Sequence, residues 1–145
     1  MEQKLQYIVD KIGKLNIQIN EKQAEQFFRY YELLVEWNGF MNLTGITDFE
    51  EVVCKHFVDS LSIISTKDMS TVENMIDIGT GAGFPGLPLK IAFPNVKVTL
   101  LDSLNKRIQF LDHVIELKES TATVAEAAEA LDVKPGMIAK TMSFL

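Results

Sequence analysis

Three glycines at alternate positions follow a single aspartate, giving the pattern Asp77-x-Gly79-x-Gly81-x-Gly83. Residues 74–78, just before the first glycine, form a short apolar run typical of a buried strand, and the residues just after the loop are predicted to be helical. A glycine turn between a strand and a helix brings bare backbone N–H groups against a ligand at the helix N-terminus. We therefore expect a small-molecule binding loop here.

The position after the third glycine distinguishes two kinds of ligand. The dinucleotide fingerprint requires a glycine where Phe84 stands. The observed spacing instead suits a nucleoside without a pyrophosphate, such as S-adenosylmethionine.

A carboxylate stands where such a loop predicts one. Residues 96–101 are predicted to form a second buried strand, and Asp102 ends it about 20 positions after Gly83. An acidic residue at this distance takes the ribose hydroxyls in nucleotide-binding βαβ units, because a carboxylate accepts two hydrogen bonds from a vicinal diol. The alternative is a solvated Asp102 that caps the next helix. The glycine loop upstream favours the ribose role.

Three further polar side chains, His56, Asp59 and Ser60, share one face of a predicted helix over 49–65 because they stand three and four residues apart. On spacing alone, a solvated polar face explains them better than a binding site.

Composition bounds the possible functions. The chain has 145 residues, 47% hydrophobic content and a net charge of −6, which fit one domain, or a small domain with an appendage, and argue against strong unaided nucleic-acid binding. Its single cysteine excludes an internal disulfide, and two histidines with one cysteine are too few for a metal site. No stretch reaches the length of a membrane span, so we expect no membrane partner. The lone Cys54 fits a reducing cytosol, so we expect a cytoplasmic location.

The elements that position these residues predict an α/β fold. Helical spacing indicates helices over 2–15 and 21–37, the second ended by Asn38-Gly39, and a later helix over 103–118. The apolar stripe of the second helix is expected in the core and comprises Ala24, Phe27, Phe28, Tyr31, Leu34 and Val35. The predicted elements from residue 74 to residue 118 therefore follow the order β-α-β-α, which implies a parallel sheet with right-handed crossovers.

Two helix starts resemble capping boxes, Asn20 with Gln23 and Asp48 with Glu51.

We expect three parts: a helical N-terminal extension over 1–70, a partial Rossmann-like unit over 71–118 and a helix-turn-strand tail over 119–145. The tail is predicted to hold a helix capped by Thr123 and a final strand within 138–145. Two or three strands make a thin sheet for a doubly wound fold. Its open edge invites pairing with a second copy, so a homo-oligomer is a possible partner state.

Several motifs in order resemble those of a known family. They are Glu36-Trp37-Asn38, Asn42-Leu43-Thr44, Lys55-His56-Phe57-Val58-Asp59-Ser60-Leu61, the glycine loop Asp77 to Pro88, and Asp102-Ser103-Leu104-Asn105-Lys106-Arg107. On these motifs, residues 1 to about 118 resemble the N-terminal half of the bacterial small-subunit ribosomal RNA guanine-N7 methyltransferases, the GidB/RsmG family.

The resemblance implies a Rossmann-like methyltransferase core, S-adenosylmethionine as methyl donor and a guanine of small-subunit ribosomal RNA as acceptor. By position, Gly79 and Phe84 would line the cofactor site and Asp102 would hold the ribose. Gly81 and Gly83 would make the turn. The cofactor-binding set is then Gly79, Gly81, Gly83, Phe84, Asp102, His56, Asp59 and Ser60. The family continues with further strands and basic residues for RNA, so this fold is expected to be incomplete relative to the family.

The tail resembles something different. Residues 120–131 and 135–144 are similar to the early part of YbaK-type prolyl-tRNA-editing deacylases, in which the lysine matching Lys140 belongs to the aminoacyl-tRNA pocket. This similarity indicates a chimera with a junction near Lys118. A surface or strand-end lysine explains Lys140 better than an editing role.

Two functions therefore stand against each other. The first is an S-adenosylmethionine-dependent methyltransferase acting on guanine N7 of small-subunit ribosomal RNA. The second is a catalytically inactive, truncated or chimeric α/β fragment that folds or oligomerises without turnover. Editing of mischarged prolyl-tRNA is a distant third.

Overall fold

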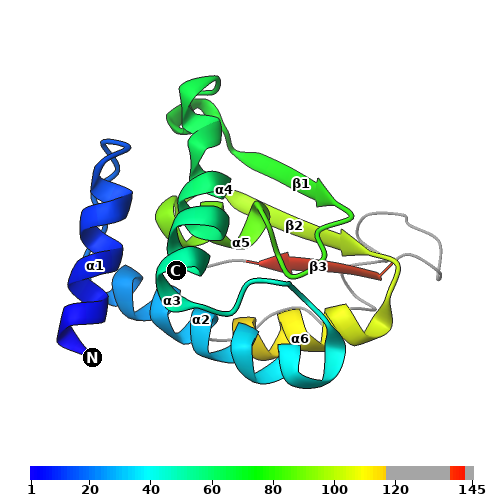
Figure 1. The fold of residues 1–145 in the computed structure, drawn as a ribbon. Coiled ribbons are helices and arrows are strands. Elements are labelled where there is room, and N and C mark those ends of the chain that lie inside the picture. The colour runs from blue at the N-terminus through cyan, green and yellow to red at the C-terminus, as the bar shows by residue number, and fades with distance from the viewer. Residues whose placement is uncertain (117–137, 143–145) are drawn as a thin grey trace.

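The computed structural model of the protein describes residues 1–116 and 138–142 (Figure 1). The chain begins with two helices, α1 over Glu2–Gly13 and α2 over Glu21–Met41. Within the described ranges, no helix combines the length and apolar character needed to cross a membrane. The helix expected after Thr123 lies outside the described residues.

Helix α2 starts where the sequence predicts and ends later. The capping box is confirmed, since the backbone N of Gln23 donates to Asn20 Oδ1 at 2.9 Å and the Asn20 N donates to Gln23 Oε1 at 2.8 Å. The expected end near Gly39 is wrong, because the helix continues to Met41 and stops where Asn42 adopts φ 51° and ψ 55°. One exposed helical glycine costs only about 1 kcal/mol, whereas a residue in the left-handed conformation ends the helix.

The buried stripe of α2 is rotated from the expected one. Its buried members are Ala24, Phe27, Tyr30, Leu33 and Leu34. Phe28, Tyr31 and Val35 are only half-buried. Adjacent helix positions point about 100° apart, so the pattern alone does not decide which of two neighbouring aromatic residues enters the core.

The helix expected over 49–65 is present as one helical segment with an irregular middle. It runs through α3 (Phe49–Val52), a π-helical stretch, η1 (Val53–Val58), then α4 (Asp59–Leu61) and the 3₁₀ turn η2 (Ser62–Ser65). A second 3₁₀ turn, η3 (Met69–Thr71), leads to the sheet.

Only half of the second capping box forms. The Glu51 backbone N donates to Asp48 Oδ1 at 3.1 Å. The Glu51 carboxylate pairs instead with Lys55, one turn along the helix, at 2.5 Å. A cation at position i+4 competes with the backbone N–H for the same carboxylate.

The β-α-β-α unit is confirmed. Strand β1 (Asn74–Ile78) leads through helix α5 (Gly86–Ala92) to β2 (Lys97–Asp102), and α6 (Asn105–Glu116) follows. β1 and β2 are parallel, with Ile78 opposite Leu101 at their carboxyl ends.

The third strand, β3 (Ile138–Met142), joins the sheet in the order β1-β2-β3. It pairs antiparallel with β2, with Ile138 opposite Asp102. The parallel pairing expected for the β-α-β-α unit is confirmed for β1 and β2, and the sequence pattern predicts no direction for β3. β3 begins beside the carboxyl end of β2, whereas a parallel neighbour would begin at the opposite end.

The helices and the sheet share one hydrophobic core. Helix α2 packs against α5 and α6, and both of these helices contact β2 (Figure 1). The buried cluster joins Ile8 and Phe27 of the first two helices to Leu89 of α5 and Phe110 of α6. The N-terminal helices therefore form one wall of the core that supports the glycine loop. The division of the chain at residue 70 and near residue 118 stays a prediction.

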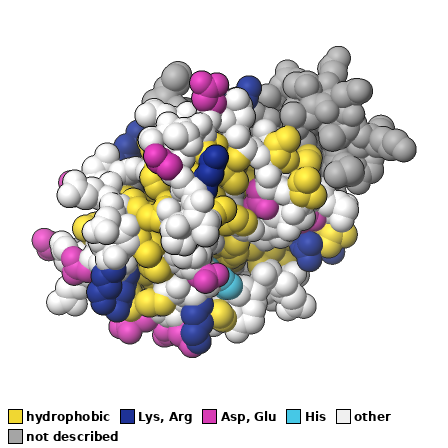
Figure 2. Space-filling model, turned by 90° about the horizontal axis from the view of Figure 1, so that it is seen from above, with side chains coloured by type: hydrophobic (Ala, Val, Ile, Leu, Met, Phe, Trp, Pro, Cys, Tyr) yellow, Lys and Arg dark blue, Asp and Glu magenta, His cyan; other side chains and the backbone are white. Residues whose placement is uncertain are grey.

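One surface of the sheet carries exposed apolar side chains. The strand predicted over 74–78 forms as β1, but the expectation that it is buried is wrong. Ile76 and Ile78 are 53% and 75% exposed, and Asp77 is the one residue of β1 that is buried. Figure 2 views the molecule from the side on which β1 lies and shows hydrophobic side chains among those at the surface. Among the described residues, β1 pairs only with β2, so its other edge is open.

Candidate functional site

The glycine loop between β1 and α5 has a backbone shape that needs glycine. Gly79, Gly81 and Gly83 all have positive φ, at 71°, 60° and 101°. This left-handed region is costly for residues with a Cβ and open to glycine. The alternate spacing seen in the sequence is thus the spacing of the left-handed positions.

The expectation of bare loop amides is wrong for most of the loop. The N–H groups of Gly79 and Thr80 donate to the Leu101 carbonyl at 2.9 and 3.0 Å. Those of Gly83 and Phe84 donate to the Thr80 carbonyl at 3.0 and 3.2 Å. The tight turn satisfies its own donors, because a buried N–H without a partner is expensive.

The glycines nevertheless leave room on one side of the loop. A Cβ added to Gly79 or Gly81 would meet no atom within 4 Å. A Cβ on Gly83 would lie 2.4 Å from Leu87 Cδ1 and 2.8 Å from the Tyr30 hydroxyl. Gly79 and Gly81 therefore present bare backbone to open space, while Gly83 lets the loop pack against the core.

Asp102 stands beside this loop, as its position at the end of β2 predicts. Its Oδ2 accepts a hydrogen bond from the Gly81 N–H at 2.9 Å, and its Oδ1 accepts one from Leu104 N at 2.9 Å. The Nη1 atom of Arg107 lies 3.4 Å from Asp102 Oδ2 and forms an ion pair with it. The side chain is thus both a brace for the loop and a cap for the turn before α6. The ribose role stays a prediction. The alternative, a solvated Asp102 that caps the next helix, accounts for the bond from Leu104 N, but Asp102 is buried.

His56 reaches the loop from the π-helical stretch. Its ring stacks on Phe84 with centroids 4.5 Å apart and an interplanar angle of 15°. Nε2 lies 2.7 Å from Thr44 Oγ1. Burial lowers the pKa of His56 below its usual value, partly opposed by the charge of Asp59. The imidazole is therefore neutral near pH 7 and suited to aromatic packing.

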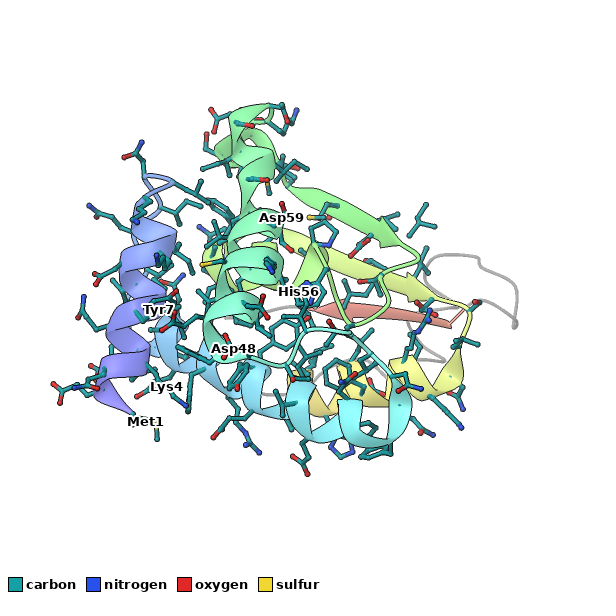
Figure 3. The ribbon with its side chains drawn as sticks, in the orientation of Figure 1. Met1, Lys4, Tyr7, Asp48, His56 and Asp59 are labelled. Carbon is teal, nitrogen blue, oxygen red and sulfur yellow. The ribbon has the colours of Figure 1, made fainter. Side chains whose placement is uncertain are left out.

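Asp59 and Ser60, on the same helical segment as His56, line a pocket beside the glycine loop. His56 and Asp59 lie on the side of their segment that faces the strands (Figure 3). The buried Ser60 hydroxyl donates to the His56 carbonyl at 2.5 Å, so it is engaged within its own helix. Asp59 is exposed and lines a pocket of about 400 Å³. The pocket lining comprises Asp59, Ser60, Ser62, Ile63, Phe84 and Pro85.

A π turn lies where this polar face meets the loop. π-helical stretches are rare and often occur at functional sites. Here the stretch Val53–Val58 contains His56 and directly precedes Asp59. The structure thus brings His56, Asp59 and Phe84 together, although helical spacing alone favoured a solvated face.

Two residues of the site were not predicted from the sequence. Asp77 Oδ2 accepts hydrogen bonds from Thr80 Oγ1 at 2.6 Å and from Gly86 N at 3.0 Å. Asp77 stands at the start of the glycine pattern, which could have marked it as a site residue. The spacing alone does not reveal that its carboxylate binds Thr80 and Gly86. Tyr30 donates a hydrogen bond to the Ala82 carbonyl, and no local pattern identifies this contact across the chain.

A larger cavity of about 940 Å³ lies away from these residues. It is lined by segments around Ile17, Asp68 and Val96, next to the start of β2. None of the predicted site residues lines it. Its size therefore does not make it the candidate site, because ligands in open α/β sheets bind outside the carboxyl ends of the strands.

Comparison with known proteins identifies the family. The GidB family, described as rRNA small subunit methyltransferase G, matches residues 23–139. The chain belongs to this family. The match continues past Lys118, so the comparisons give no support to a junction there.

Curated relatives named ribosomal RNA small subunit methyltransferase G agree with this assignment. The protein of Lachnoclostridium phytofermentans is 53% identical over 124 residues, covering 83% of this chain and 51% of the relative. The Staphylococcus carnosus and Lysinibacillus sphaericus proteins are 50% and 49% identical over 127 residues, each covering 86% of this chain and 53% of the relative. The chain spans about half the length of these relatives.

The first prediction concerns the close contact of α5 with the sheet. Replacing Gly86 by alanine places a Cβ 2.4 Å from Leu100 Cδ2 and 3.0 Å from Asp77 Oδ2. We expect Gly86→Ala to lower the free energy of unfolding by about 1–3 kcal/mol through overpacking, measured by urea denaturation. Gly39→Ala is the matched control, since its Cβ meets nothing within 4 Å and it should add about 0.5–1 kcal/mol. Equal effects of both substitutions would contradict the contact.

The second prediction concerns the pH dependence set by Asp77. Burial raises the pKa of Asp77 above its ordinary value of 3.8, opposed by the bonds from Thr80 and Gly86. A raised folded-state pKa contributes stability below pH 3.8 that is lost as pH rises through the folded pKa. Asp77→Asn keeps both acceptor bonds, so we expect the decline in stability from about pH 4 upward to flatten.

Thermal unfolding of both proteins between pH 3 and pH 8 measures this difference. Asp77→Ala is the control, because it leaves the Thr80 hydroxyl and the Gly86 N–H without their acceptor. We expect it to cost about 1–3 kcal/mol relative to the asparagine variant. If the melting temperatures of the wild type and of Asp77→Asn change with pH in parallel, the raised pKa of Asp77 is contradicted.

Proposed function

We propose that this chain is the cofactor-binding portion of an S-adenosylmethionine-dependent methyltransferase that acts on guanine N7 of small-subunit ribosomal RNA. Membership of the GidB family and the names of the relatives support this proposal. The observation that carries it is the contact of Gly81 N with Asp102 Oδ2 at 2.9 Å, beside the open faces of Gly79 and Gly81. An adenosyl group fits this arrangement, because its ribose needs a carboxylate and its bulk needs a backbone without Cβ atoms.

The site residues divide the task of holding the cofactor. Gly79 and Gly81 admit the nucleoside, Gly83 keeps the loop against the core, and Asp102 is the proposed ribose acceptor. S-adenosylmethionine supplies an activated methyl group when bound. N7 of guanine is already nucleophilic, so the protein chiefly positions donor and acceptor.

The remaining site residues are assigned to the same cofactor pocket. Phe84 offers an aromatic wall, held by its stack with His56. Asp59 and Ser60 line the adjoining 400 Å³ pocket. The lowered pKa of His56 argues that it acts as a packing group and not as a cation.

Ribosomal RNA is the proposed partner and the cytoplasm the proposed location. The net charge of −6 makes tight unaided RNA binding unfavourable, so we propose that further contacts come from outside this chain. The comparisons give no support to a resemblance of residues 119–145 to prolyl-tRNA-editing deacylases, or to an editing role for Lys140.

A third prediction tests cofactor binding directly. We expect S-adenosylhomocysteine to give a saturable isotherm in calorimetry, and Gly81→Val to abolish it. A β-branched residue at φ 60° is strained and fills the open face of the loop. Gly45→Val is the control, because Gly45 lies in an exposed loop with nothing within 4 Å of its added Cβ. No heat for the wild-type protein at millimolar ligand would refute the proposal.

The alternative is a catalytically inactive fragment that oligomerises through the open edge of β1. The exposure of Ile76 and Ile78 favours it. Under this alternative, light scattering should show a species larger than one chain, and Ile78→Lys should shift it to the monomer by placing charge on the edge strand. A strictly monomeric wild-type protein would remove the reason for this alternative.

A further inference from the structure

Tyr30 brings the N-terminal helical layer into contact with the glycine loop. It lies in the middle of α2 and is fully buried. Its hydroxyl donates a hydrogen bond to the carbonyl oxygen of Ala82, which sits in the loop between Gly81 and Gly83. A residue from the first fifth of the chain therefore supports the centre of the candidate cofactor site.

The ring of Tyr30 is held so that its hydroxyl has little freedom. It stacks on Phe57 with centroids 5.3 Å apart and an interplanar angle of 23°. Phe84 and Phe110 contact it at centroid distances of 5.6 and 6.4 Å. Aromatic neighbours from three other elements fix the ring, so the direction of the phenolic O–H is set by core packing.

The Ala82 carbonyl belongs to a peptide group beside a flexible residue. The N–H of the same peptide is that of Gly83, and it donates to the Thr80 carbonyl at 3.0 Å. Gly83 has a φ of 101°, and glycine populates both signs of φ with similar ease, so this peptide is less restricted than one between bulkier residues. The Tyr30 hydroxyl adds a second bond to it from inside the core.

The shape of the loop is matched to this hydroxyl. A Cβ on Gly83 would lie 2.8 Å from the Tyr30 oxygen. The missing side chain at Gly83 thus lets the loop approach the phenol. The pKa of Tyr30 is raised well above its usual value, first by burial and then by the charge of Asp77, so the hydroxyl remains a donor at neutral pH.

We propose that Tyr30 is a positioning residue for cofactor binding: its hydroxyl fixes the Ala82 peptide and thereby holds Gly81 in the orientation that Asp102 and the cofactor require. The inference rests on the proposed function. It assigns to the N-terminal helices a part in binding beyond support of the core. Tyr30 contacts Phe84 and the Ala82 carbonyl but does not reach the open faces of Gly79 and Gly81, so its effect on the cofactor passes through the loop.

Removing one oxygen atom tests the proposal. Tyr30→Phe keeps the ring and leaves the Ala82 carbonyl without its donor. In calorimetry with S-adenosylhomocysteine, we expect the 145-residue variant to bind about tenfold more weakly than the wild type. Tyr31→Phe is the matched control, since its hydroxyl donates to the Thr47 carbonyl at 3.3 Å, away from the loop. We expect that variant to bind as the wild type does.

A second control separates positioning from a general loss of stability. Ile12→Val removes one methylene from the fully buried Ile12 of α1, which is not one of the site residues. If it weakens binding as much as Tyr30→Phe at a similar loss of melting temperature, the effect is structural and the proposal is wrong. Equal binding by Tyr30→Phe, Tyr31→Phe and the wild type would overturn it as well.

Hydrogen exchange gives a readout that does not need the cofactor. The amides of Gly83 and Phe84 donate to the Thr80 carbonyl in the wild type. We expect both to exchange faster in Tyr30→Phe, while amides of α1 keep their protection. If the wild type fails to bind S-adenosylhomocysteine, the proposed function falls, and exchange at these two amides still decides whether Tyr30 fixes the loop. Unchanged exchange there would refute the positioning role.

Discussion

The site depends on a stretch of backbone that alternates into the left-handed region at Gly79, Gly81 and Gly83. Glycine adopts such a stretch at far lower cost than residues with a Cβ, and glycine brings no preference of its own for that shape. The loop must therefore be held by its surroundings. The β2 strand holds its start through the Leu101 carbonyl, and the side chain of Asp102 holds its middle. The binding surface is consequently a product of the core and not of the loop alone.

The supports of the loop come from three separate elements. Asp77 ends the loop's own strand and bonds the start of α5, Asp102 ends the neighbouring strand, and Tyr30 comes from α2. All three side chains are buried, where an unsatisfied polar group is costly. Each bond is therefore worth more than its equivalent at the surface, and the loop is coupled to the packing of the helices that cover it.

Much of this arrangement was predictable from local sequence. The strand over 74–78, the strand ending at Asp102 and the helices around them follow from hydrophobic periodicity and turn residues, and the glycine spacing marked the site. The errors have two causes. The choice of Tyr30 over Tyr31 and the bonds from the Gly79 and Thr80 amides to Leu101 depend on contacts between residues far apart in the chain. The end of α2 is set locally, by the left-handed conformation of Asn42.

The sequence by itself determined the order of helices and strands, the family, and the place where the chain must bend without side chains, because propensity, periodicity and the absence of a Cβ are properties of neighbouring residues. Only the tertiary structure decided that His56 stacks on Phe84, that the loop donors are satisfied internally, and that a tyrosine hydroxyl meets Ala82. Apart from the bonds that the Gly83 and Phe84 amides make to Thr80, those contacts join segments separated by tens of residues. Their geometry is fixed by how the layers pack together, which no local pattern encodes.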